Sequence, residues 1–250
     1  MNITLDSISL MTSPYRVKKM TVEDVENREI SVMGLARQRG GLLLNAELKP
    51  KKFTLIGAIT GTDQADLDDN IDTFKELITR RSKDLDMTYG SGTRRYIVTA
   101  SKINIPREHY HIDYCPFEVE FIAPAGVGYD TTETTETQTG ITDLTKNDAI
   151  TIAGSAPPDV KLTLTFTAEN AITSLDFLAN GNKITLTAAF TSTDVVVFDA
   201  ENMKVTLNGT EVAYTGIFPE FFIGSNDYLI EAHGTSCTYN YTLAYTKTYA

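Results

Sequence analysis

Alternating apolar and polar residues in short runs dominate the second half of the chain. Near the C-terminus Cys237, Tyr239, Tyr241, Leu243 and Tyr245 fall on one side of an extended segment, and polar residues such as Thr and Asn fall on the other. A period of two is that of a strand with one buried face. Runs of this kind, without a helical pattern, predict a β-sandwich of the jelly-roll type. They span 161–167, 171–178, 183–190, 194–198, 204–207, 211–215, 228–231 and 238–246.

Turn residues separate these strands. Asn180-Gly181-Asn182, Asn208-Gly209 and Gly224-Ser225-Asn226 each interrupt an apolar run. Asn-Gly is typical of a type I′ hairpin turn, because both central residues of that turn need a positive φ. We also expect Phe218, and either Phe221 or Phe222, to fill the core of the sandwich beside Gly224–Asn226.

The first half contains one predicted helix, over about 63–81. Thr62 or Asp63 is the expected N-cap. The aspartates 63, 66, 68 and 69 near its start and the cations 75, 80, 81 and 83 near its end complement the helix dipole. Its apolar residues recur at intervals of three and four and form one stripe, consisting of Leu67, Ile71, Phe74, Leu77 and Ile78.

Strands surround this helix in the sequence. Two strands are expected within 30–48, split by Arg39-Gly40-Gly41, and one over 51–60. A hairpin around Gly90-Ser91-Gly92 joins 85–89 to 94–105, and a last pair spans 110–114 and 117–122. The pattern predicts an N-terminal β-sandwich or barrel-like domain with one α-helix, so the chain as a whole is mainly β.

Charge divides the chain in two. Residues 1–123 carry 17 Lys and Arg against 18 Asp and Glu, whereas residues 124–250 carry 5 against 15 and contain no Arg. We therefore expect an N-terminal domain (1–126), a Thr- and Glu-rich solvated linker (127–140) and a C-terminal sandwich (141–250). The acidic balance of the second part disfavours nucleic-acid binding through phosphates.

The sharpest candidate for chemistry is the run His109, His111, Asp113 and Cys115, which share one face if the segment is a strand. Four such positions extend over roughly 20 Å, so they cannot converge on one metal ion. The aspartates at the start of the helix lack the spacing of a calcium loop, and capping explains them better. Cys115 and Cys237 show no zinc-ribbon or disulfide pattern.

No enzyme motif is present: the chain lacks GxSxG, HExxH, P-loop and GxGxxG sequences. Asp199 and Glu201 lie too close in sequence to be expected on two sides of a glycosidic bond. We expect no catalytic, cofactor-binding or metal site, and no enzyme. The N-terminus lacks the pattern of a secretory signal, and no apolar run is long enough to insert into a membrane.

The stretch Asp194–Asn226 resembles the C-terminal half of the distal tail proteins (Dit) of long-tailed bacteriophages. It sets an Asp-flanked strand, an Asn208-Gly209 hairpin, Phe218-Pro219 and Gly224-Ser225-Asn226 in the order found in that family. The first half is also similar to the family's N-terminal domain in its order of strands, long helix, Gly-Ser-Gly hairpin and aromatic strand ending in Ala-Pro.

The resemblance implies a structural virion protein made in the host cytoplasm and placed at the tip of the phage tail. In that family a homo-hexameric ring, built by the N-terminal domains, connects the tail tube protein to the hub or fibre (tail-associated) protein. It forms a platform for host-adsorption proteins and leaves a channel for DNA passage. The C-terminal domain is galectin-like, with receptor-binding proteins or cell-surface sugars as further partners.

Two other functions stay open. A stand-alone carbohydrate-binding protein would share the lectin-like sandwich, and a tail-associated hydrolase would need convergent carboxylates. We expect no specific nucleic-acid binding. The basic residues Arg37, Arg39, Lys49, Lys51, Lys52, Arg94 and Arg95 are expected to face neighbouring subunits or the tube.

Overall fold

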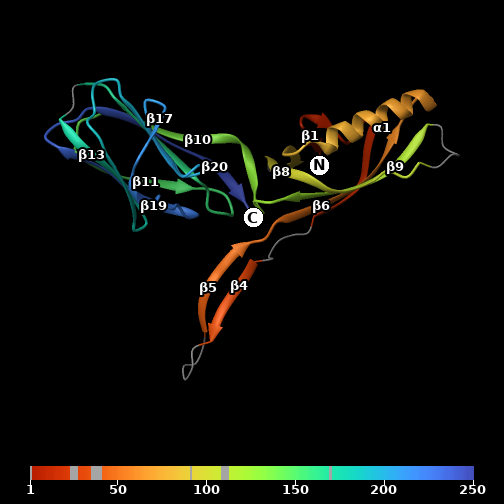
Figure 1. Cartoon of the computed structure of the whole chain (residues 1–250), viewed down its shortest axis with the longest axis horizontal. Helices are drawn as coiled ribbons and strands as arrows, with labels where there is room; N and C mark the ends of the chain where they lie inside the picture. Colours follow the sequence, from red (N-terminus) through yellow and green to blue (C-terminus); the bar gives the residue numbers. More distant parts are fainter. Residues whose placement is uncertain (1, 23–27, 35–40, 91, 108–112, 169–170) are drawn as a thin grey trace. The chain divides into compact units, whose positions relative to one another are not determined.

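The computed structural model describes residues 2–250 except 23–27, 35–40, 91, 108–112 and 169–170; for 28–34 and 41–48 it describes the backbone alone. The chain forms two compact units, one of Met1–Tyr129 with Ala250 and one of Asp130–Tyr249 (Figure 1). Most described residues lie in antiparallel strands, so the mainly β class is confirmed. Among the described residues, no helix has the length and apolar character that crossing a bilayer requires.

The first unit is a curved sheet with one helix. The long strand β8 pairs with β7 through its first half and with β9 through its second half, so the series β2-β1-β7-β8 continues as β8-β9-β6-β3. Strands β4 and β5 form a separate two-stranded sheet. The strands are β1 (Asn2–Leu5), β2 (Ile8–Ser9), β3 (Tyr15–Val22), β4 (Arg28–Gly34), β5 (Gly41–Leu48), β6 (Lys51–Thr60), β7 (Lys83–Tyr89), β8 (Gly92–Asn104) and β9 (Tyr114–Ala123).

Helix α1 (Gln64–Thr79) packs its apolar stripe on this sheet. Asp63 is the N-cap and accepts hydrogen bonds from the backbone N–H groups of Ala65 and Asp66, each at 3.0 Å. All five residues of the predicted stripe are buried. Phe74 makes the central contact, with its ring 4.6 Å from that of Phe117. The helix prediction is confirmed, although α1 ends at Thr79 and its last turn contains no basic residue.

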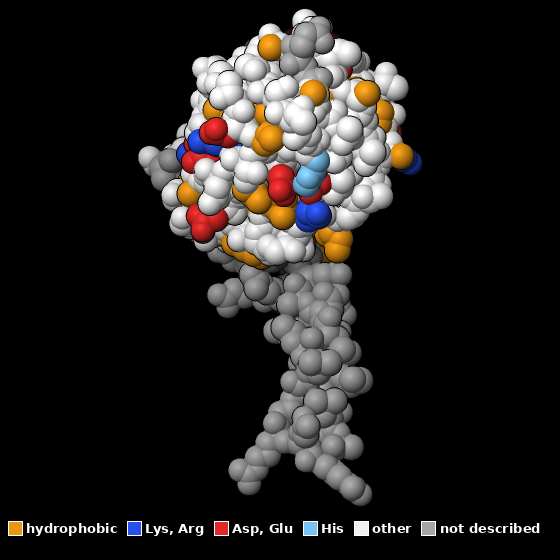
Figure 2. Space-filling view, turned by 90° about the vertical axis from the view of Figure 1, so that its left-hand side faces the viewer, with side chains coloured by type: hydrophobic (Ala, Val, Ile, Leu, Met, Phe, Trp, Pro, Cys, Tyr) orange, Lys and Arg blue, Asp and Glu red, His pale blue; other side chains and the backbone are white. Residues whose placement is uncertain are grey.

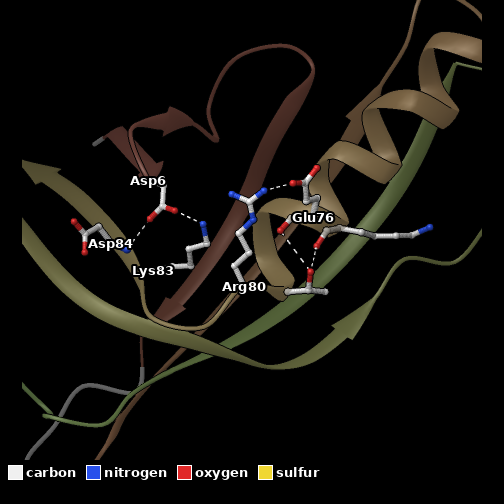
Figure 3. A network of polar contacts seen from close by, with 7 residues as sticks. Asp6, Glu76, Arg80, Lys83 and Asp84 are labelled. Carbon is white, nitrogen blue, oxygen red and sulfur yellow. Dashed lines mark hydrogen bonds and ion pairs between the residues drawn. The ribbon is translucent and has the colours of Figure 1, made fainter.

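A polar network holds the end of α1 and the start of β7 near the β1–β2 turn (Figure 3). Lys83 is buried and forms an ion pair with Asp6, whose other oxygen accepts the backbone N–H of Asp84 at 3.0 Å. Burial raises the pKa of Asp6, but these hydrogen bonds outweigh it and lower the pKa below its ordinary value. At the end of the helix the C-cap residue Arg80 pairs with Glu76.

The second unit is a sandwich of two sheets. One sheet has the order β17-β16-β15-β12-β20-β10, and the other has the order β11-β19-β13-β14-β18. The strands are β10 (Gly128–Ile141), β11 (Thr145–Ile152), β12 (Val160–Phe166), β13 (Ile172–Ala179), β14 (Asn182–Thr187), β15 (Val195–Asp199), β16 (Lys204–Leu207), β17 (Thr210–Val212), β18 (Thr215–Gly216), β19 (Gly224–Gly234) and β20 (Tyr239–Tyr249).

The core of the sandwich lies between the inner faces of these sheets. The residues of β20 that were predicted to share a face, from Tyr239 to Tyr245, are buried there, as is Cys237 just before the strand. Phe218 and Phe221 also belong to this core, whereas Phe222 is exposed. Asn208 and Gly209 have φ values of 52° and 78°, so the Asn-Gly hairpin between β16 and β17 has the left-handed turn expected from the sequence.

Two expectations about local structure were wrong. The segment 127–140, expected as a solvated linker, forms most of β10, because Thr favours strands even where both faces are polar. Residues Gly224–Asn226, expected as a turn, begin β19 and pair with β11. Of the two strands expected over 110–122, the second lies within β9, and most of the first, 110–112, lies outside the described part of the chain.

The place of β10 predicts where a stable C-terminal fragment must begin. A fragment of 128–250 retains β10, the strand beside β20. In a fragment of 141–250, β20 still pairs with β12 but becomes the edge strand of its sheet. We expect both fragments to be folded monomers by circular dichroism and sedimentation, with 141–250 melting at least about 5 °C lower. Equal melting temperatures would show that β10 contributes nothing to the unit.

Residues 217–223, between β18 and β19, form a Phe-rich loop. Substitutions of its three phenylalanines should lower stability by different amounts. Phe221 packs against Phe177 and Tyr228, with ring centroids 6.1 Å and 6.4 Å apart. Phe221→Ala should lower the free energy of unfolding by about 3–5 kcal/mol in urea titrations, and Phe218→Ala by the lower end of that range. Phe222→Ala is the matched control and should change it by less than about 0.5 kcal/mol. A large loss for Phe222→Ala would contradict the burial pattern.

Candidate binding surfaces

The residues that carry the family resemblance fix turns. Asp194 accepts hydrogen bonds from the backbone N–H of Thr191 at 2.6 Å and from the side-chain amide of Asn208 at 2.8 Å. Asn208 in turn accepts the N–H of Val195. At the other end of β15, Asp199 accepts the backbone and side-chain N–H groups of Asn202. These carboxylates therefore form hydrogen bonds that hold loops.

The Phe-Pro and Gly-x-Asn elements have the same role. Asn226 is buried, and its side-chain oxygen accepts the N–H of Phe222 at 2.8 Å while its amide donates to the carbonyls of Phe222 and Gly224. Asn180 donates to Asn226 from the turn between β13 and β14. One asparagine thereby joins the Phe-rich loop to two strands of the second sheet.

This loop forms one wall of an apolar groove of about 450 Å³. Its floor and walls contain Tyr214, Phe218 and Phe221, and Phe222 at its edge is about half exposed. The other lining residues are Pro157, Pro158, Asp159, Ala200, Met203, Gly216, Ile217, Pro219 and Glu220. The only charged groups among the lining residues are two carboxylates. The groove therefore suits an apolar segment that carries a basic group.

A polar cluster lies on the outer face of the β11-β19-β13-β14-β18 sheet. Asp176 on β13 pairs directly with Thr185 on β14 and with Glu231 on β19. Its Oδ2 lies 2.9 Å from Nε2 of His233 and 2.9 Å from Nζ of Lys183. Figure 2 shows an imidazole, an amino group and carboxylates gathered on this face. The ligand atoms of Asp176, Glu231 and His233 all lie within 4.8 Å of one another.

The carboxylate of Asp176, at the centre of this cluster, is buried and negatively charged. Asp176 is only 2% exposed, although it is on the outer face, because neighbouring side chains cover it. Burial raises the pKa of Asp176, but hydrogen bonding by Thr185, His233 and Lys183 and the charge of Lys183 outweigh it and lower the pKa below its ordinary value. Asp176 is therefore ionised at neutral pH.

Sequence reasoning missed this cluster because its members come from three strands. The available signal was Asp176 itself, a carboxylate within the otherwise apolar run Leu175–Leu178. The positions of the partner residues depend on register, and a bulge between Ile172 and Ser174 alters the pairing of β13 with β19.

The other metal-ligand candidates from the sequence lie partly outside the described residues. His109 and His111 lie outside the described residues; Asp113 is exposed, and Cys115 is buried with its thiol near the carbonyl of Pro106. Asp63 and Asp66 form hydrogen bonds at the N-terminus of α1. The aspartates of α1 therefore act in capping, as expected.

Three of the basic residues singled out from the sequence have partners within the first unit. Arg95 donates a bidentate pair of hydrogen bonds to the Asp86 carboxylate, each at 2.8 Å, and also forms an ion pair with Asp84. Lys51 is buried with its amino group 5.4 Å from the Tyr96 ring centroid, and Arg94 lies over Tyr89. Arg37 and Arg39 lie outside the described residues.

The face of the first sheet opposite α1 is open. Because Phe117 points to the helix, its neighbours Glu118 and Glu120 point the other way, where Lys102 lies 3.2 Å and 3.4 Å from their carboxylates. Ile56 pairs with Glu118 across β6 and β9 and is 37% exposed. This face therefore presents one partly exposed apolar side chain among paired charges.

The cluster around Asp176 predicts a pH-dependent contribution to stability. Since its pKa is lower in the folded chain than the unfolded value of about 3.9, its contribution is complete above that value and is lost as the pH falls through the folded pKa. Asp176→Asn should lower the free energy of unfolding by about 1.5–3 kcal/mol at pH 7. The difference from wild type should shrink in urea titrations as the pH is lowered below about 3.9.

Asp227 supplies the control for this measurement, because it lies exposed on the same strand as His233. Asp227→Asn should leave the unfolding free energy within about 0.5 kcal/mol at both pH values. An Asp176→Asn penalty that stays constant with pH would show that packing, and not ionisation, causes it.

Comparison with known proteins agrees with the resemblance seen in the sequence. Residues 153–249 match the family model described as the siphovirus-type tail component, C-terminal domain. No curated protein sequence matches the chain.

One solved structure shows the same fold over the whole chain. The crystal structure of the Dit protein (gp 19.1) of phage SPP1 aligns with 100% of this chain and 99% of its own, at a TM-score of 0.71 and 15% identity. That protein is described as a paradigm of the hub adsorption apparatus in phages that infect Gram-positive bacteria. A baseplate chain of phage p2, in an activated conformation with Sr, aligns over 97% of both chains at a TM-score of 0.46 and 8% identity.

These findings agree with the predicted relationship: residues 153–249 match the family model of the siphovirus-type tail component, C-terminal domain, and the whole chain has the fold of SPP1 Dit.

Proposed function

We propose that this protein is a structural component of the phage tail tip, assembled as a homo-hexameric ring between the tail tube and the tail hub or fibre. The match of residues 153–249 to a tail-component family carries the proposal. The fold shared with SPP1 Dit supports extending it to the whole chain. The protein acts by assembly and not by catalysis.

The open face of the first unit supports ring formation. A closed ring requires head-to-tail contacts in which one surface of each subunit meets a different surface of its neighbour. The sheet face around Ile56, Glu118 and Lys102 offers an apolar side chain within a ladder of both charges. Such a surface gives register and specificity to a contact without a large hydrophobic patch.

The groove of the second unit supports the role of a platform for adsorption proteins. Its apolar lining would receive an apolar segment of another tail protein, and Asp159 and Glu220 would attract a Lys or Arg on that segment. Burial, with a smaller effect from Asp199, raises the pKa of Asp159. A basic partner group would therefore relieve repulsion between neighbouring carboxylates.

The charge distribution supports a channel that passes DNA without holding it. The chain has a net charge of −11. Lys83, Arg95 and Lys102 of the first unit already pair with carboxylates of the same unit. Each contact with a DNA phosphate needs an available cation, and the pairing of these three residues lowers the number of available cations.

The proposal predicts a hexamer in solution that depends on Ile56. Native mass spectrometry of the purified chain should show six copies, and negative-stain images should show rings. Ile56→Asp places an unpaired carboxylate beside Glu118 and should shift the protein to monomers at micromolar concentration. Ile217→Asp, an exposed position of the second unit, is the control and should leave the hexamer intact. A wild-type monomer that binds a glycan would instead favour the carbohydrate-binding alternative.

A further inference from the structure

We propose that Asp176, Glu231 and His233 form a binding site for a divalent transition-metal ion, represented here by Zn²⁺. Nothing in the proposed tail function requires this site. It rests on the geometry of the outer face of one sheet.

The ligand set matches the chemistry of zinc. One imidazole nitrogen and two carboxylate oxygens converge from adjacent strands, with their atoms within 4.8 Å of one another. Zinc binds such nitrogen and oxygen ligands at about 2.0–2.2 Å and completes a tetrahedron with water. Calcium prefers six to eight oxygens, which this cluster does not offer. Both strands have fixed neighbours on each side, so the ligands lie on a rigid part of the fold.

The charges of the cluster favour binding of a cation. Asp176 and Glu231 are directly opposed on β13 and β19, an arrangement of like charges that destabilises a sheet. Lys183 neutralises Asp176, but among the described residues no ion pair to a basic side chain is formed by Glu231. An ion held between the two carboxylates would remove this repulsion.

A second observation also indicates a ligand. Asp176 is almost fully buried, and its Oδ1 has no hydrogen-bond partner among the described residues. The Thr185 hydroxyl lies near the carboxylate and contributes to lowering its pKa, yet it does not complete a bond to Oδ1. A buried carboxylate oxygen without a partner is costly unless another group binds it. A metal ion that binds the carboxylate through both oxygens would supply that group.

Lys183 occupies the place of the ion in the absence of metal. Its amino group lies 2.9 Å from Asp176 Oδ2, and its side chain is about half exposed, so it can turn away into solvent. A metal ion binds the lone pair of His233 Nε2, so the neutral imidazole would bind as the tautomer that carries its hydrogen on Nδ1. Lys183 is thus a competitor of the metal and not a ligand.

Isothermal titration of the tag-free full-length protein with ZnCl₂ tests the site. We expect one Zn²⁺ per chain. His233→Ala and Glu231→Gln should each weaken Zn²⁺ binding by about 100-fold or more. Losing a direct ligand should cost more than losing a residue that only orients a ligand, which typically costs about 10–100-fold. Lys183→Met should tighten it by roughly fivefold or more, as expected from removing a unit charge near the ion. Ca²⁺ and Mg²⁺ should not bind at the same concentrations.

Two controls separate this site from others on the chain. Asp227→Asn removes a carboxylate from the same strand and should leave the affinity for Zn²⁺ unchanged. The double variant His109→Ala/His111→Ala should also retain binding, and its loss would assign the zinc to that segment and overturn the proposal. An unchanged affinity in His233→Ala would overturn it too, as would weaker binding in Lys183→Met, because Lys183 would then support the site.

Discussion

Buried tyrosine hydroxyls link the two sheets of the second unit. Tyr241 on β20 crosses the core and donates to Asp148 on β11 at 2.9 Å, and Tyr228 on β19 forms a hydrogen bond with the Tyr241 hydroxyl. Tyr245, four residues along β20, donates to the carbonyl of Thr151 on β11 at 3.3 Å. A buried hydroxyl needs a partner, so these bonds fix both the spacing of the sheets and the register of β11. Burial is the main cause that raises the pKa of Tyr228 to about 12.

Packing and hydrogen bonds in the core constrain the residues on the inner faces of the sheets. They constrain the residues on the outer faces much less. On the second sheet the outer residues of β13, β14 and β19 carry a buried aspartate and its partners, which no requirement of the core explains. In the first unit the helix covers one face of the sheet, and the opposite face displays Ile56 within paired charges. The metal site that we propose and the face that we assign to ring formation therefore lie where the fold imposes few restrictions.

The predictability of each part follows from the range of the interactions that form it. Helix α1 and the buried face of β20 were predicted correctly because their periodicity is local. Strand β10 was missed because its Thr, Glu and Gln residues are polar on both faces, so no alternation marks it. The cluster of Asp176, Glu231 and His233 was missed because strand pairing, including the bulge after Ile172, brings its members together. Sequence separation of up to 57 residues hides that pairing.

The residues that made the relationship recognisable act on the fold and not on partners. Asp194, Asn208 and Asn226 direct their polar groups to the backbone of neighbouring turns and strands. Such residues indicate what the chain folds into. What it contacts depends on outward side chains, such as Ile56 and Phe222, that no turn or core requires. Two proteins of this fold can therefore keep one architecture and bind different partners.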